Sequence, residues 1–255
     1  MLTAAPKWLI ERPIAHRALH DLKQGRAENS IGAFKAAIRA DYAIECDLQI
    51  SATGEPVVFH DSNLLRMTGE TGNVCDFTPD ELNKFKLAKT DDGINTLQKH
   101  LEKMAGRVPV ILELKGLHGR HKDLVEGTAA ALRNYDGQVA VMSFRPEICQ
   151  HFATLLPDIP RGLTAKGDAT HHETHARHMI DFDLQFISYD VNALPHPTTT
   201  WLQQERIPII TWTVKTPKQV ELTRNWADQM TFEGFDPDTL PQPDVNLDEF
   251  GISVF

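Results

Sequence analysis

Two carboxylates, Glu45 and Asp47, lie two residues apart in a stretch where apolar and polar side chains alternate. A period of two is typical of a β-strand, and it places both carboxylates on the face opposite Ile44 and Cys46. As unpaired anions about 4 Å apart they would repel each other by ~4 kcal/mol at an effective dielectric constant of 20. A fold tolerates such a pair when a cation lies between the two groups, so the spacing indicates a metal site.

An imidazole is expected close to the same carboxylates. After a short turn the chain runs back through apolar residues to His60. Six residues separate Ile50 from Val57, and a parallel crossover needs about a dozen or more. We therefore predict an antiparallel hairpin that returns His60 towards Glu45 and Asp47.

Short β-rich runs alternate with helical patterns along the chain and predict the scaffold that positions these groups. The expected strands are Ile14–Arg17, Ala43–Ile50, Val108–Lys115, Gln138–Phe144, Arg161–Ala165, Gln185–Tyr189, Ile207–Val214 and Gln229–Glu233. The expected helices are Ser30–Ala40, Thr96–Met104, His121–Asn134, Pro146–Leu156, His171–Phe182, Thr198–Glu205 and Pro217–Trp226. Eight strands alternating with helices predict an α/β fold, a (β/α)₈ TIM barrel, as one domain over residues 1–255.

The segment 61–93 does not fit this alternation. It contains turn signals and a predicted short helix at Pro79–Lys86, so we expect a small inserted subdomain, or cap, after the second barrel strand and its return hairpin.

The N-cap residue of the first barrel helix is expected to be Asn29 or Ser30, and that of the last barrel helix Thr216, which precedes Pro217.

Barrel enzymes carry their reactive groups at the C-terminal ends of the strands. The chemistry-bearing residues expected at these ends are His16, Arg17, Glu45, Asp47, Glu113, Lys115, Phe144, Arg145, Trp212 and Lys215. The oxygen set of Glu45, Asp47 and Glu113 favours a hard divalent cation, Mg²⁺ or Ca²⁺ with Mn²⁺ also suitable, over zinc.

The remaining polar groups suit an in-line displacement at a phosphodiester. His16 and His60 are candidate general acid and base. Arg17 and Lys115 would hold the phosphate, the arginine through two parallel hydrogen bonds.

These motifs, in this order and spacing, resemble the glycerophosphodiester phosphodiesterase family over most of the chain, most densely in residues 14–82. The resemblance is carried by His16-Arg17, Glu28-Asn29-Ser30 with Ala33-Phe34, Glu45-x-Asp47, the run from Gly54 to Asp61, Thr68, Thr78-x-x-Glu81-Leu82, Glu113-Leu114-Lys115, Ser143-Phe144 and Trp212-Thr213-Val214. It implies a barrel with a small inserted subdomain and metal-dependent hydrolysis of glycerophosphodiesters to glycerol 3-phosphate and an alcohol. It further implies a metal on Glu45, Asp47 and Glu113, acid–base catalysis by His16 and His60, and a phosphate held by Arg17 and Lys115.

The chain departs from the family pattern at several positions. Ala18 replaces a usual glycine, Lys215 an asparagine, and the last strand ends in Glu233 where an aspartate is usual. None of these is expected to touch the catalytic set. Arg145 and Lys215 add positive charge at the barrel mouth, which predicts a substrate with a second anionic group.

Several roles stay open on the sequence alone. Glu28 is expected to orient His16 or Arg17, and Lys115 would alternatively serve only to neutralise Glu113. Phe144 and Trp212 suit barrel packing and a substrate wall equally.

A histidine cluster lies apart from the strand-end residues and comprises His171, His172, His175 and His178. Its spacing would suit zinc on a helix. Because neither a cysteine nor a second ligand strand accompanies it, a solvated helix face is the favoured interpretation.

Two alternative functions stay open as well. One is a phospholipase-D-like or phosphatidylinositol-lyase-like barrel that forms a cyclic phosphate. The other is a barrel that binds phosphodiesters without turning them over.

Composition limits the partners and the location. A net charge of −9 argues against nucleic acid and anionic membranes. No apolar run approaches 18 residues, so we expect no integral membrane segment.

Three widely spaced cysteines and the lack of a secretory signal predict a cytoplasmic protein. The proline- and acid-rich tail 241–255 is expected to pack on the barrel floor or on another subunit of a homo-oligomer.

Overall fold

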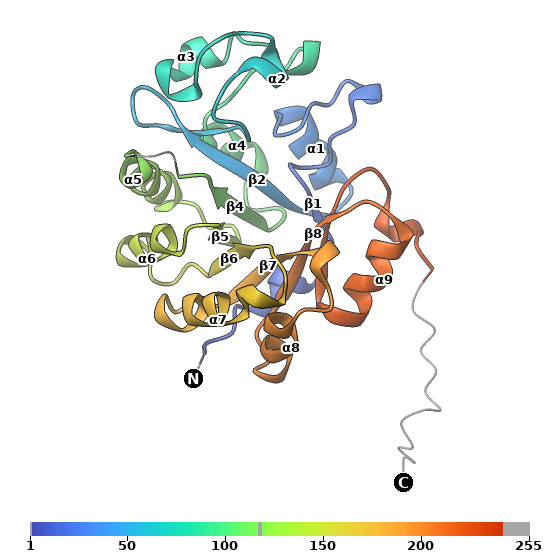
Figure 1. Ribbon diagram of the computed structural model, residues 1–255. Helices are drawn as coiled ribbons and strands as arrows, with labels where there is room; N and C mark the ends of the chain where they lie inside the picture. The colour runs from blue at the N-terminus through green and yellow to red at the C-terminus, as the bar shows by residue number, and fades with distance from the viewer. Residues whose placement is uncertain (1, 117–118, 242–255) are drawn as a thin grey trace.

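The structure, a computed structural model, describes residues 2–116 and 119–241. Eight parallel strands within these residues form a closed barrel (Figure 1), in which β1 pairs with both β2 and β9 and the order between them is β8-β7-β6-β5-β4. The strands are β1 Ile14–Ala15, β2 Ala43–Ile50, β4 Val110–Leu114, β5 Val139–Ser143, β6 Arg161–Ala165, β7 Phe186–Asp190, β8 Ile209–Val214 and β9 Gln229–Phe232. The predicted (β/α)₈ barrel is confirmed.

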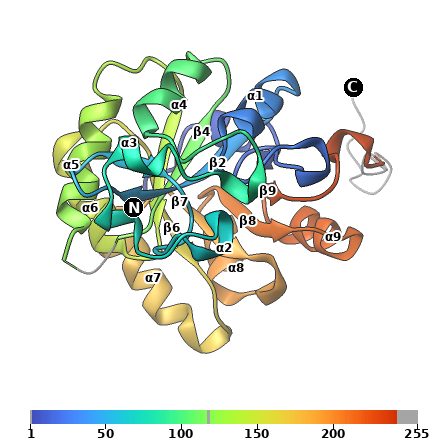
Figure 2. The same cartoon turned by 90° about the horizontal axis from the view of Figure 1, so that it is seen from above.

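Helices connect the strands and surround the barrel, as Figures 1 and 2 show. They are α1 Ile31–Arg39, α4 Leu97–Met104, α5 His121–Leu132, α6 Pro146–Leu155, α7 His172–Asp181, α8 Pro197–Gln204 and α9 Pro217–Trp226. Ser30 caps α1 by accepting from the backbone N–H of Ala33, and Thr216 forms a capping box with Gln219 at the start of α9. Both caps satisfy backbone N–H groups that have no partner within the helix.

The two faces of β2 enter different environments. Ile44, Cys46, Leu48 and Ile50 belong to the large apolar cluster that includes residues of α1, α4 and α5. Ala43, on the other face, packs in a second cluster with residues of β1, β4, β5, β7 and β8 and with Leu9. This second cluster is an apolar layer inside the barrel, which a mostly parallel sheet requires.

The acidic residues follow this layer along the same strands. Ala43 precedes Glu45 and Asp47 on β2, and Ile111 precedes Glu113 on β4. The β2–β4 register pairs Asp47 with Glu113, so the two carboxylates are neighbours across the sheet. The barrel therefore collects its acids towards the C-terminal ends of the strands.

The hairpin after β2 also agrees with the prediction, because β3 (Pro56–Val58) pairs antiparallel with β2. The backbone N–H of Phe59 donates to the carbonyl of Asp47 at 2.9 Å, and the Gln49 amide donates to the carbonyl of His60 at 2.8 Å. These bonds hold His60 beside the acidic strand.

The segment 61–93 contains α2 (Leu65–Thr68) and α3 (Pro79–Leu82), which lie together at the top of Figure 1. The helix expected at Pro79–Lys86 is shorter than predicted, and turn residues and the short 3-10 helix Leu87–Lys89 follow it. An apolar cluster of this segment includes Leu64, Leu82 and Val57 of β3, so the segment packs on the hairpin. The limits of the domain and of the insertion stay predictions.

Three further points concern the helices, the cysteines and the tail. Within residues 2–116 and 119–241, each helix is too short or too polar to cross a membrane. Cys46, Cys75 and Cys149 are all free. The tail predicted to pack on the barrel floor lies, beyond residue 241, outside the described residues.

Candidate active site

Glu45, Asp47 and Glu113 converge at the centre of the site. Each offers an oxygen that lies within 4.8 Å of the others, and all three residues are buried. They come from adjacent strands, because β2 pairs with β4. The structure thus brings together the three residues predicted as metal ligands.

Lys115 and Arg17 bring positive charge to these acids. Lys115 Nζ lies 2.8 Å from Asp47 Oδ1 and 2.5 Å from Glu113 Oε1. Arg17 Nε lies 3.6 Å from Asp47 Oδ2 and has no hydrogen-bond partner among the described residues, although it is buried. Burial alone would raise the pKa of Asp47, but Lys115, His60 and Arg17 lower it below the usual value.

The two cations do not balance the three acids. Burial, followed by the charges of Asp47 and Glu113, raises the pKa of Glu45 well above its usual range. Burial also raises the pKa of Glu113. Ionised carboxylates are costly to bury without compensating charge, so the site fits one further cation. Its donor set, oxygen only, suits Mg²⁺ or Ca²⁺ better than zinc.

The backbone at the end of β1 is turned towards Glu45. Arg17 and Ala18 have φ angles of 52° and 62°, in the left-handed region that non-glycine residues seldom occupy. This turn lets the Arg17 N–H donate to Glu45 Oε2 at 2.9 Å and the Ala18 N–H donate to the carbonyl of Glu45 at 3.0 Å. Strained backbone of this kind is often found at functional sites.

Asn29 also serves the acids. Its side-chain Nδ2 donates to Asp47 Oδ2 at 2.9 Å, and the residue is buried with a φ of 58°. Of the two residues considered as the cap of α1, Ser30 is the cap, and Asn29 holds the orientation of the Asp47 carboxylate.

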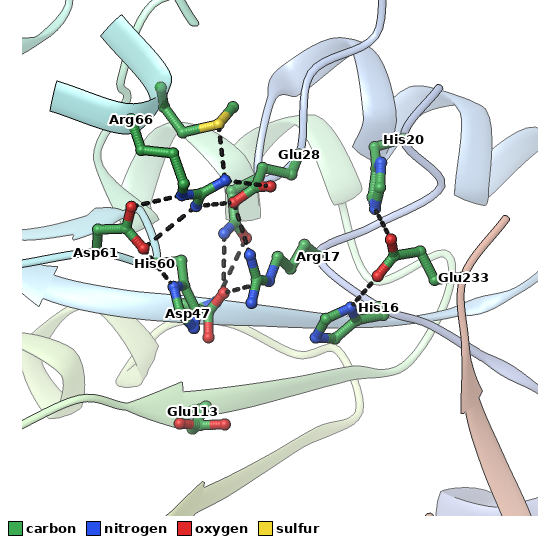
Figure 3. A network of polar contacts seen from close by, with 12 residues as sticks. His16, Arg17, His20, Glu28, Asp47, His60, Asp61, Arg66, Glu113 and Glu233 are labelled. Carbon is green, nitrogen blue, oxygen red and sulfur yellow. Dashed lines mark hydrogen bonds and ion pairs between the residues drawn. The ribbon is translucent and has the colours of Figure 1, made fainter. Parts of the chain in front are cut away.

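A charged network links His60 to Arg17 (Figure 3). His60 Nδ1 lies 2.6 Å from Asp61 Oδ1, and Arg66 Nε donates to Asp61 Oδ2 at 2.6 Å. Arg66 Nη2 donates to Glu28 Oε1 at 2.6 Å, and the same oxygen accepts from Arg17 Nη1 at 2.8 Å. Arg66, from α2, therefore joins the acidic partner of His60 to the acidic partner of Arg17.

A second network reaches His16. His16 Nδ1 lies 2.9 Å from Glu233 Oε2, and Lys215 Nζ donates to Glu233 Oε1 at 2.9 Å. The expectation that the departures from the family pattern avoid the catalytic set is therefore wrong. Glu233 and Lys215 follow β9 and β8, and the closure of the barrel brings them beside the end of β1.

The pKa values of both candidate imidazoles are lowered, mainly by burial. Coulombic interaction with Asp47 opposes the shift in each case. The two imidazoles therefore respond to the same carboxylate, and a neutral ring of this kind can accept a proton.

The other predicted substrate residues lie at the ends of β5 and β8. Phe144 is 43% exposed, and its ring packs edge-on against Trp212 with centroids 5.6 Å apart. Arg145 Nε donates to Glu147 at 2.8 Å, so its charge, like that of Lys215, already faces a glutamate. The predicted role of these cations in binding a second anionic group gains no support from their partners.

One member of the histidine cluster departs from the solvated helix face that was expected, whereas His171 is exposed. His175 is buried, and its Nδ1 lies 3.2 Å from the Tyr189 hydroxyl, which also lies 2.9 Å from His196 Nε2. For His175 the expectation is wrong, because the sequence pattern of α7 does not reveal the buried tyrosine of β7. Among the described residues, the group able to hold a metal is formed by the three strand-end acids rather than by these histidines.

Sequence reasoning missed Arg66 and Glu233 as site residues. The signal for Arg66 was its position five residues after Asp61, within the segment that was predicted to form a cap. For Glu233, the signal was a charged residue at the end of the last barrel strand, where reactive groups are expected.

Comparison with known proteins identifies a matching family. The model of the glycerophosphoryl diester phosphodiesterase family matches residues 16–239. Glycerophosphodiester phosphodiesterase 1 of Bos taurus is 28% identical over 173 residues, which cover 61% of this chain and 51% of that protein. A glycerophosphodiester phosphodiesterase of Caldanaerobacter subterraneus is 42% identical over 115 residues, which cover 44% of this chain and 42% of that protein. The chain thus spans about half the length of these curated relatives.

A solved structure shares the fold. The phosphodiesterase of Oleispira antarctica, in complex with the product sn-glycerol-3-phosphate, superposes with a TM-score of 0.77 at 19% identity. The match covers 88% of this chain and 93% of that one.

Proposed function

The chain belongs to the glycerophosphoryl diester phosphodiesterase family, and from this premise we propose that it hydrolyses glycerophosphodiesters to glycerol 3-phosphate and an alcohol. The observation that carries the proposal is the meeting of Glu45, Asp47 and Glu113 within 4.8 Å of one another. Buried acids gathered in this way beside Arg17 and Lys115 suit a metal-assisted reaction at a phosphate.

Glu45, Asp47 and Glu113 would hold one divalent cation, Mg²⁺, Ca²⁺ or Mn²⁺. When bound, it would stabilise the negative charge that develops on the phosphoryl oxygens.

The cationic side chains bind and orient the phosphate. Glu28 holds the Arg17 guanidinium through Nη1, and the buried Nε–H is left without a hydrogen-bond partner among the described residues, so the group is oriented by one contact and keeps further donors for a phosphate. Burial alone would lower the pKa of Lys115, but Asp47 and Glu113 raise it, so the ammonium stays charged. Fixed positive groups of this kind stabilise a transition state without reorganising.

His16 and His60 move the protons. One imidazole takes a proton from the water that attacks phosphorus, and the other gives a proton to the alkoxide that leaves as the P–O bond breaks. Each ring has its Nδ1 against a carboxylate, Glu233 for His16 and Asp61 for His60. The two rings therefore share one arrangement, with Nε2 as the nitrogen available for proton transfer.

Phe144 and Trp212 are proposed to wall the site of the leaving alcohol, since their rings pack together at the ends of β5 and β8. We further propose a cytoplasmic location, which the three free cysteines support.

Turnover of a panel of glycerophosphodiesters tests the proposal. Glycerophosphocholine, glycerophosphoethanolamine and glycerophosphoserine would each be incubated with Mg²⁺, Ca²⁺ or Mn²⁺, and in parallel with excess EDTA. We expect release of glycerol 3-phosphate with at least one cation and its loss in EDTA. A cyclic glycerophosphate, detected by ³¹P NMR, would instead identify the cyclising reaction, and binding without turnover would identify a non-catalytic barrel.

A further inference from the structure

The side chain of Glu233 touches a proposed catalytic imidazole and a lysine at the same time. We propose that Glu233 is a positioning residue for His16, that Lys215 holds it in place, and that it fixes the imidazole tautomer whose Nε2 is free for proton transfer. The inference rests on the proposed function and names a further part of the same site.

The geometry assigns a separate task to each carboxylate oxygen. Oε2 lies 2.9 Å from His16 Nδ1, and Oε1 lies 2.9 Å from Lys215 Nζ. An ionised carboxylate can only accept hydrogen bonds, so His16 must carry its proton on Nδ1. In the neutral ring Nε2 then keeps its lone pair, which a general base needs.

The carboxylate of Glu233 is held ionised. The hydrogen bond with His16, with a further contribution from Lys215, lowers the pKa of Glu233 to about 2 even though burial opposes the shift. His20 adds a third basic group, with its Nε2 4.0 Å from Oε1. The side chain of Glu233 is 24% exposed and that of His16 14% exposed, so solvent screens this contact less than it screens an ion pair on the surface.

The supporting elements make the contact rigid. Glu233 directly follows β9 and its backbone N–H donates to the carbonyl of Val214 at 3.0 Å, which fixes it beside Lys215. The backbone N–H of His16 donates to the carbonyl of Phe232 at 3.0 Å. His16, Lys215 and Glu233 are therefore tied together through their backbones before their side chains meet.

This arrangement gives Lys215 a role different from binding an anionic group of the substrate. Its ammonium faces the Glu233 carboxylate at 2.9 Å, and this negative charge offsets the attraction of Lys215 for a second anion. The same pairing orients Oε2 towards His16, because it fixes the rotation of the carboxylate.

Kinetics of matched variants test the proposal. In Glu233→Gln the amide can either accept from Nδ1–H or donate to Nδ1, so the tautomer is no longer imposed. We expect kcat to fall by about 10- to 100-fold, a part of the ~10²–10⁴-fold that general acid–base catalysis supplies. KM should stay within about twofold, because the contact acts on the transition state rather than on substrate binding.

Glu233→Asp keeps a carboxylate and should retain more activity than Glu233→Gln. The control is Glu126→Gln, which removes an exposed glutamate 3.8 Å from Lys122 on α5 and should leave kcat unchanged. Thermal unfolding of each variant establishes that it folds. Unchanged kcat in a folded Glu233→Gln protein would overturn the proposal.

The tautomer itself is measurable without turnover. Nitrogen-15 NMR of the imidazoles, with the His16 signals assigned by their loss in His16→Asn, should show a protonated Nδ1 and an unprotonated Nε2 in the unaltered protein. Glu233→Gln should shift these signals towards a mixture of tautomers. Protonation at Nε2 in the unaltered protein overturns the inference even if diesters are hydrolysed, so its failure is distinguishable from failure of the proposed function.

Lys215→Met separates support from substrate binding and also serves if Glu233→Gln does not fold. If Lys215 holds Glu233 in place, kcat should fall by about 3- to 10-fold and KM should stay unchanged. The fall should be equal for glycerophosphocholine and for the anionic glycerophosphoserine. A rise in KM for glycerophosphoserine alone would instead show that Lys215 binds the substrate, and would overturn its supporting role.

Discussion

Replacement of Glu45 by glutamine tests the electrostatics of the buried acids directly. Glu45, Asp47 and Glu113 place one oxygen each within 4.8 Å of the others, and Lys115 contacts Asp47 and Glu113. The Glu45 side chain has no ion pair with Lys115 or Arg17 among the described residues, and its carboxylate accepts only the Arg17 backbone N–H. Glutamine keeps the shape and the acceptor oxygen and removes the charge.

The magnitude follows from Coulomb's law. Two unit charges 4.8 Å apart repel by about 3.5 kcal/mol at an effective dielectric constant of 20. The high pKa of Glu45 already relieves part of this repulsion by protonation. We therefore expect the metal-free Glu45→Gln protein to be more stable than the unaltered one by roughly 1–3 kcal/mol at pH 8.

Metal binding should reverse this order. A cation at about 100 times its dissociation constant stabilises the folded state by about 2.7 kcal/mol, which corresponds to a rise in Tm of roughly 5–10 °C for a domain of this size. Glu45→Gln removes one of three acidic ligands, so we expect Mg²⁺ or Ca²⁺ to raise its Tm by less than about 2 °C.

Thermal unfolding in EDTA and in excess Mg²⁺ or Ca²⁺ measures both effects, with Glu126→Gln as the exposed control. The reasoning would be refuted if Glu45→Gln destabilised the EDTA-treated protein by several kcal/mol. An equal rise in Tm on adding either cation to the variant and to the unaltered protein would refute the assigned metal site.

Two further predictions concern residues around the site and outside it. Arg66→Met removes the link between Asp61 and Glu28, so Asp61 would be held by His60 alone and Glu28 by Arg17 alone. We expect kcat to fall about 10-fold or more, whereas Arg177→Met on the surface of α7 should leave kcat unchanged. Equal activity of the two variants would show that Arg66 has no role in positioning. Burial, together with neighbouring histidines, lowers the pKa of His175 to about 4, so its contribution to stability is complete above pH 6.5 and is lost as the pH falls towards 4. Between pH 7.5 and pH 5 the free energy of unfolding should fall by about 2 kcal/mol through this group. Urea unfolding should show a smaller fall for His175→Gln. An identical dependence of the free energy of unfolding on pH in the two proteins would contradict the prediction.

The sequence alone determined the local periodicities and what they imply. The alternation around Glu45 and Asp47 predicted a strand, and the short return to His60 predicted an antiparallel hairpin; both agree with the structure. Such features depend on residues close together in the chain, where pleat and turn length leave few options. The same holds for the eight-fold alternation that indicated the barrel.

Only the tertiary structure decided which side chains meet across the barrel. The contact between His16 and Glu233 joins residues 217 positions apart, and that between Glu28 and Arg66 spans 38. Neither spacing has a local signature, because the pairs form when β1 closes on β9 and when α2 packs beside the barrel. The burial of His175 also depends on tertiary contacts. The sequence of α7 is polar, and His175 is buried because Tyr189 and His196 lie against it.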